Sequence, residues 1–165
     1  MKNIFFIAAG IISVQVAAAQ LKTTAACPVF KVDVLEGTFN DDLNLKSTAG
    51  EIKTIFPCFS EIADEISGAK CGGIFYKEKG IYFYTSRNYI EIGANFKGKL
   101  SLPFMGASRG SLFKWLGYAK IKDINWDAFQ TKYGILILYY NKAGKINKLQ
   151  MSSKSADTIK LCEKG

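Results

Sequence analysis

Four cysteines constrain the fold of this chain more than any other residues: Cys27, Cys58, Cys71 and Cys162. An even number of cysteines in an exported protein predicts disulfides, and four cysteines allow three pairings. We expect Cys58 to pair with Cys71, as a staple between a helix end and the next strand, and Cys27 with Cys162, as a tie between the two ends of the domain. A metal site is the first alternative, but no CxxC spacing and no histidine accompany the cysteines. A lipid-anchored Cys27 is the second, although Thr24-Ala25-Ala26 lacks the usual aliphatic residue of a lipoprotein signal and Cys27 lies well past the N-terminal apolar run.

The first nineteen residues predict export. Lys2 gives a basic start, an apolar run extends from Ile4 to Val16, and three alanines stand before Gln20 as a small-residue cleavage position. This is the three-part pattern of a secretory signal peptide, and its apolar run is too short for a comfortable membrane span. We therefore expect residues 1–19 to be removed and the mature protein to be secreted or periplasmic, without stable membrane insertion.

The formal net charge of +8 is unevenly distributed along the chain. Residues 22–65 carry a net charge of −4, whereas residues 66–165 carry +11. Such polarity favours another protein with an acidic surface as partner, through electrostatic steering. The alternative is a solvated lysine-rich surface with no such role. Nucleic acid is not expected, because the basic residues are mostly isolated lysines and export separates the chain from nucleic acid.

Local patterns predict two short helices among many strands. Thr48 and Glu51 form a capping box at the start of a helix that Pro57 ends. A second helix is expected over residues 111–116, with Trp115 in the core and Gly117 just past its end. Alternating or apolar runs bounded by turn residues predict the strands. The main ones are residues 74–76, 81–85, 89–92, 134–140 and 145–152.

A weak internal repeat suggests how these elements are arranged. Each half has a short helix followed by a strong strand that opens with Gly-Ile, at Gly80 and at Gly134. We therefore expect an α+β fold of two tandem units, each a short helix plus an antiparallel β-sheet, stapled by disulfides. The expected organisation is a signal peptide at 1–19, an irregular N-terminal segment with one short strand at 20–46, a first unit at 47–104 and a second unit at 105–165.

The second half also resembles a known module. Residues 112–117, Tyr133-Gly134-Ile135 and Gly144-Lys145-Ile146 are similar to the module of the β-lactamase inhibitory protein and of outer-membrane assembly factors of the small-protein-A type. The Cys58–Cys71 spacing is similar to the helix-to-strand disulfide of the inhibitor family, but the second half lacks its own cysteine pair. The resemblance implies a non-enzymatic protein that binds another protein through one face of a sheet.

Catalytic chemistry is not expected. The chain has no histidine, which removes the commonest general base and the commonest metal ligand. No cofactor, metal or catalytic residue is predicted.

The strand at 81–85 offers the best candidate binding residues. Ile81 and Phe83 face one side of a strand, and Tyr82 and Tyr84 face the other. With Tyr89 and Arg87 nearby, the tyrosines would form an exposed binding face, since Tyr and Arg dominate binding hot spots. Alternatively, they only cover a sheet face.

Arg109 is the remaining candidate, because it lies in a glycine-rich loop and an arginine there can bind a carboxylate or phosphate. The sequence thus predicts an exported, non-enzymatic protein-binding module, either an inhibitor or an envelope assembly factor. One alternative is a small-ligand binder or hydrolase with a pocket between sheet and helices. Another is a structural envelope component that self-associates.

Overall fold

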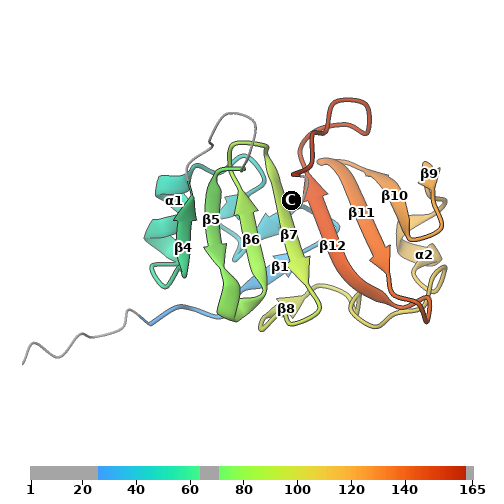
Figure 1. Ribbon diagram of the computed structural model, residues 1–165, viewed down its shortest axis with the longest axis horizontal. Helices are drawn as coiled ribbons and strands as arrows, with labels where there is room; N and C mark the ends of the chain where they lie inside the picture. Colours follow the sequence, from blue (N-terminus) through green and yellow to red (C-terminus); the bar gives the residue numbers. More distant parts are fainter. Residues whose placement is uncertain (1–25, 64–70, 163–165) are drawn as a thin grey trace, which may run out of the picture.

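One eight-stranded antiparallel sheet dominates the computed structural model, which describes residues 26–63 and 71–162 (Figure 1). The predicted signal peptide at 1–19 lies outside the described residues. The strand order is β4-β5-β6-β7-β12-β11-β10-β9. The strands are β4 (Glu61–Ala63), β5 (Gly73–Tyr76), β6 (Ile81–Tyr84), β7 (Tyr89–Gly93), β9 (Ile121–Lys122), β10 (Trp126–Thr131), β11 (Gly134–Tyr140) and β12 (Ile146–Ser152).

A four-stranded sheet lies behind the middle of the large sheet in Figure 1. Its order is β3-β2-β1-β8, and only the β1–β8 pair is parallel. The strands are β1 (Lys31–Asp33), β2 (Thr38–Phe39), β3 (Leu43–Asn44) and β8 (Lys99–Leu100). The segment 20–46, in which one strand was expected, thus contains β1, β2 and β3. The helices are α1 (Ala49–Ile55), α2 (Phe113–Leu116) and a 3₁₀ turn, η1 (Lys77–Lys79).

The expectation of an α+β fold with two tandem helix-plus-sheet units is wrong. Strands β7 and β12 pair along Tyr89–Gly93 and Lys148–Ser152, so the two halves share one continuous sheet. Helix α1 has 7 residues and α2 only 4, and the small sheet shares the core of the large one. The chain is therefore mostly β. The pairing of β7 with β12 joins residues far apart in sequence, for which neither strand carries a local signal.

The predicted capping box is confirmed, because Glu51 N–H donates to the Thr48 hydroxyl and the Glu51 carboxylate accepts from Thr48 N–H. The helix it begins packs on the core through Ile52 and Phe56, which are both buried. Phe56 stacks on Phe30 with ring centroids 3.9 Å apart. The N-terminal segment is thereby held against α1.

Alternation along the strands divides the large sheet into two faces, with a register shift between β11 and β12 at Tyr139 and Tyr140. The inner face packs on the small sheet and presents large apolar side chains from neighbouring strands in register, such as Phe83 opposite Ile90 and Leu149 opposite Leu138. The outer face carries the half-buried Tyr82 and is partly covered by the segment 153–162. The predicted opposite orientation of neighbouring residues along β6 is confirmed.

The expected disulfide pairing is wrong. Cys27 pairs with Cys58 and Cys71 with Cys162, at Cα–Cα distances of 5.4 and 5.9 Å. The first bridge forms because the stacking of Phe30 places the N-terminal segment beside the end of α1.

The second bridge depends on the C-terminal segment. Ile159 and Leu161 pack on the outer face against Ile135 and Ile137, which carries the chain across the sheet to the start of β5. Sequence proximity favoured the wrong partners because it ignores these two packing contacts.

Candidate functional site

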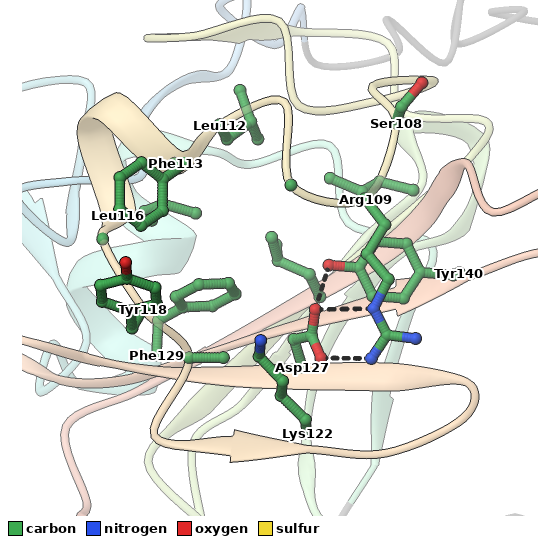
Figure 2. Close-up of a pocket in the computed structure, with 15 residues that line it drawn as sticks. Ser108, Arg109, Leu112, Phe113, Leu116, Tyr118, Lys122, Asp127, Phe129 and Tyr140 are labelled. Carbon is green, nitrogen blue, oxygen red and sulfur yellow. Dashed lines mark hydrogen bonds and ion pairs between the residues drawn. The ribbon is translucent and has the colours of Figure 1, made fainter.

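A cavity of about 400 Å³ lies between the segment 108–122, which carries α2, and the inner face of β10 and β11 (Figure 2). This volume falls within the range of roughly 300–1,000 Å³ typical of small-molecule sites. The cavity is mainly apolar. Its apolar side chains are Leu112, Phe113, Leu116, Phe129, Leu138 and Ile146.

Backbone pairing holds one end of this segment on the sheet. Gly106 N–H donates to the carbonyl of Ile146 at 2.8 Å, and Ile146 N–H donates to that of Ala107 at 2.9 Å. Leu112 is buried and anchors the start of α2. Gly117, with φ of +66°, ends the helix in a backbone conformation that favours glycine. The wall of the cavity is therefore a single helical turn, which follows the backbone pairing with Ile146 and the buried Leu112 and ends at Gly117.

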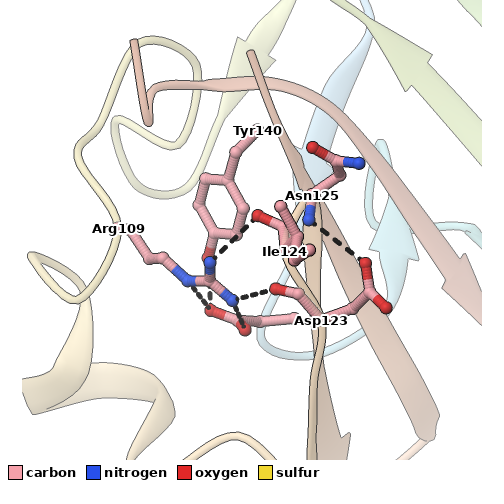
Figure 3. A network of polar contacts seen from close by, with 6 residues as sticks. Arg109, Asp123, Ile124, Asn125 and Tyr140 are labelled. Atoms are coloured by element: carbon pink, nitrogen blue, oxygen red, sulfur yellow. Dashed lines mark hydrogen bonds and ion pairs between the residues drawn. The ribbon is translucent and has the colours of Figure 1, made fainter. Parts of the chain in front are cut away.

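An ion pair closes the polar end of the cavity (Figure 3). Arg109 binds the buried carboxylate of Asp127 through Nε, at 3.0 Å, and through Nη2. The guanidinium also donates to the backbone carbonyls of Asp123 and Ile124, and the Tyr140 hydroxyl donates to Asp127 at 2.9 Å. Its hydrogen bonds to the carboxylate raise the pKa of Arg109. This network ties the loop before α2 to the turn between β9 and β10.

The sequence-based candidate Arg109 is therefore engaged inside the protein. Its guanidinium carbon also lies 4.9 Å from the centroid of the Tyr140 ring, a cation–π distance. The carboxylate it binds belongs to Asp127 of the same chain, so its role in the structure is to position the wall of the cavity.

Lys122 is the other charged side chain of the cavity, and Figure 2 shows its amino group directed into the open space. The register β9–β10 sets Lys122 opposite Asp127, on the inner face of the sheet. Within residues 26–63 and 71–162, no ion pair or hydrogen bond of this amino group is found. The charges of Arg109 and Asp127 compensate each other, so the cavity carries the net positive charge of Lys122.

Between residues 113 and 124, five large apolar side chains are exposed to solvent, and one of them, Ile121, points to the outer face of the sheet beside Ala128. This set, named here the α2 rim, consists of Phe113 (49%), Trp115 (39%), Tyr118 (83%), Ile121 (39%) and Ile124 (86%), with the exposed fraction of each in parentheses. Exposed apolar side chains concentrated in one segment, with Phe113 and Tyr118 in ring contact at 4.8 Å, favour an interaction site in this region. Trp115 was expected in the core and is not, because α2 is only one turn long and the buried side chain that anchors it is Leu112, directly before the helix.

The predicted tyrosine face lies elsewhere. Tyr82 and Tyr84 are half-buried on the outer face of β6, and Arg87 is half-buried in the turn that follows. Tyr89 is only 2% exposed. It stacks on Tyr84 at 4.5 Å, and its hydroxyl accepts a hydrogen bond from Cys162 N–H. Tyr89 is therefore part of the packed structure, and the structure does not bring these tyrosines together with Arg109.

A polar cluster also crosses the outer face. Gln150 donates to the Glu91 carboxylate at 2.8 Å and accepts from the Tyr139 hydroxyl at 2.7 Å. The Lys148 amino group lies 3.6 Å from the Glu91 carboxylate and 3.9 Å from the centroid of the Tyr139 ring. These contacts link β7, β12 and β11, so the cluster fixes the pairing of the strands across the middle of the sheet.

Metal and membrane features were sought in the described part of the chain. It contains no group of three or more His, Cys, Asp or Glu residues arranged to hold a metal ion. None of its helices has the length and apolar character to cross a bilayer.

Apart from Arg109, sequence reasoning missed the polar residues that make the cavity. Asp127 is an isolated acid in the sequence, and only the long-range pairing of β10 reveals that Arg109 meets it. The rim had a local signal, since Tyr118, Ile121 and Ile124 alternate with charged residues in a segment for which no element was predicted. Apolar residues that alternate with charged residues in a loop are the local pattern that could have indicated the α2 rim.

Comparisons with known proteins leave the resemblance noted above as a prediction from sequence. No protein-family model, no curated protein and no solved structure matches this chain.

Proposed function

We propose that this chain is an exported, non-enzymatic protein that binds another protein through the α2 rim. The observation that carries the proposal is the exposure of five large apolar side chains within residues 113–124. Burying such a surface is favourable by about 25 cal/mol per Å² of apolar area. Trp115 and Tyr118 are of the residue types that most often dominate interfaces.

Rigidity supports the same proposal. The rim stands on a loop that Arg109 ties to the turn carrying Ile124, through two hydrogen bonds to backbone carbonyls and an ion pair with Asp127. A surface that is already ordered loses less conformational entropy when a partner binds. The net charge of +11 over residues 66–165 favours an acidic partner, whose approach it would accelerate.

Export supports it indirectly. Two disulfides are typical of proteins that fold in an oxidising compartment, and the predicted signal peptide agrees with this. The partner would then be a secreted, envelope or cell-surface protein.

Photo-crosslinking in the native host tests the proposal. A photoreactive p-benzoylphenylalanine is placed at Tyr118 in the rim, at Tyr82 on the outer face, or at Val29, which is 56% exposed at a distance in sequence from both. We expect a covalent adduct with a second protein from position 118 only. An adduct from position 82 alone would move the contact to the tyrosine face, and an adduct of twice the chain mass would indicate self-association. The first result would refute the rim as the contact, and the second would refute a different protein as the partner.

A matched pair of double variants separates binding from folding. Tyr118→Ser with Ile124→Ser removes the two most exposed rim side chains, while Val29→Ser with Ile62→Ser removes two exposed apolar side chains elsewhere. Both proteins should have the stability of wild type within about 0.5 kcal/mol, because surface substitutions rarely cost more. Only the rim variant should fail to recover, by affinity capture without a crosslinker, the partner that crosslinking from position 118 identified.

A further inference from the structure

We infer that the cavity under α2 binds a small amphipathic anion, with an apolar body and a single carboxylate head. This inference concerns the interior of the cavity and does not depend on the proposed protein contact. Three features of the cavity support it: the buried apolar side chains of its floor, the net charge of its lining residues and its volume.

The floor of the cavity is built to receive an apolar group. Leu138, Ile146, Leu112 and Phe129 are each less than 9% exposed, yet all four line the open space. Figure 2 shows the Phe129 ring directed toward it from the sheet. An apolar chain bound against these side chains would displace water from the recessed apolar floor of the cavity, which is favourable.

The lining selects the charge of the ligand. Asp127 would disfavour an anion if it were free, but it accepts two hydrogen bonds from Arg109 and one from Tyr140. The remaining charge is the amino group of Lys122, on the side of the cavity opposite the loop before α2. A carboxylate head near Lys122 would form a charge-assisted hydrogen bond, which is stronger than a bond between neutral groups.

The volume sets the size of the ligand. If each non-hydrogen atom takes roughly the 30 Å³ that a water molecule occupies in the liquid, 400 Å³ holds about thirteen such atoms. A ten-carbon carboxylate has this size. We therefore commit to a free medium-chain fatty acid, as opposed to a phospholipid in a bilayer, whose two acyl chains exceed the space.

Titration of the purified protein tests the inference with decanoate and decanol, which differ only in the head group. Binding is measured by isothermal titration calorimetry below the concentration at which the probes aggregate. We expect saturable binding of one decanoate and at least tenfold weaker binding of decanol. Equal affinity for the two probes, or no saturable binding of decanoate, would overturn the inference.

Two variants locate the site. Lys122→Met keeps the length of the side chain and should reduce decanoate affinity about tenfold, to the level of decanol, whereas Lys120→Met, an exposed neighbour outside the cavity, should stay within twofold of wild type. Ala119→Phe should fill the cavity and abolish binding of both probes. Equal decanoate affinity in the two lysine variants would overturn the assignment.

A separate sedimentation experiment distinguishes a free fatty acid from a membrane surface as the ligand. Vesicles of phosphatidylglycerol are added to the protein in the absence of decanoate, and binding is followed by sedimentation. We expect the protein to stay in the supernatant. Sedimentation of the protein with the vesicles would indicate a bilayer surface as the ligand and would overturn the proposal of a free fatty acid.

Discussion

Replacement of Arg109 by methionine is expected to destabilise the protein by about 2–3 kcal/mol. Asp127 is 4% exposed, and without the guanidinium its carboxylate keeps only the Tyr140 hydroxyl as a side-chain partner. Removing one member of a fully buried pair costs roughly 3–5 kcal/mol. The Arg109 side chain is 36% exposed, so solvent screening places the expected cost below that range. The free energy of unfolding would be measured by urea denaturation at pH 7 with the disulfides intact.

A double variant identifies the origin of this loss. Because the penalty comes from the uncompensated carboxylate, Arg109→Met combined with Asp127→Leu should be more stable than Arg109→Met alone. Lys142→Met, at an exposed position of the β11–β12 turn, is the matched control and should change stability by less than about 0.5 kcal/mol. If Arg109→Met itself falls within that limit, the ion pair does not hold the wall of the cavity and the reasoning fails.

The other predictions concern the two disulfides, the buried Phe30 and the stability of the protein at alkaline pH. Replacing both Cys71 and Cys162 by serine should cost about 4–5 kcal/mol, and replacing Cys27 and Cys58 about 3–4 kcal/mol, because the longer loop loses more entropy when it is closed; equal urea midpoints for the two variants would contradict this. Phe30→Ala should cost about 3–5 kcal/mol by chemical denaturation, since the buried ring stacks on α1 and the cavity left behind cannot close; a loss under 1 kcal/mol would contradict its place in the core. Burial raises the pKa of two tyrosines to about 12 and that of four others still further above 10. They are Tyr84 and Tyr139, and Tyr76, Tyr89, Tyr133 and Tyr140. The unfolded chain therefore loses these protons at lower pH than the folded protein, so their contribution to stability is intact below pH 10 and decreases above it by about 1.4 kcal/mol per pH unit for each tyrosine. Absorbance at 295 nm should show several tyrosines ionising together with unfolding; their independent ionisation near pH 10 in the folded protein would contradict the burial.

Local features of the fold could be predicted from the sequence. The alternation of residues along Ile81–Tyr84 gives the two faces of β6, and the turn residues around Gly134–Tyr140 delimit β11. The capping box at Thr48 gives the start of α1. Each of these signals is contained within a few neighbouring residues, which is why a single sequence suffices.

The arrangement of those elements could not be predicted. The sequences of β7 and β12 each have the pattern of an ordinary half-buried strand. Neither sequence indicates that the two strands pair and so join the two halves of the sheet. The overestimated role of the helices has the same origin. Apolar spacing around Trp115 suggested a core helix. The small sheet, of which β1, β2 and β3 come from the segment thought to be irregular, covers the core instead.

The contacts within the candidate site could not be predicted from the sequence either. Arg109 was identified as a carboxylate-binding residue, but the carboxylate proved to be that of Asp127, 18 residues later in the same chain. Tyr89 was expected on the surface and is buried, since the C-terminal segment and Tyr84 pack against it. Local patterns thus give the chemical types of the residues, and the tertiary contacts decide which of them remain available to a ligand.

Hydrogen exchange on the complex with the cross-linked partner tests the central claim most directly. Exchange is compared peptide by peptide between the free chain and the complex, and residues 112–124 report on the α2 rim and the cavity wall. Slower exchange in this segment, with residues 81–84 unchanged, is the expected result. Protection confined to residues 81–84, with the segment 112–124 exchanging as in the free chain, would contradict the account.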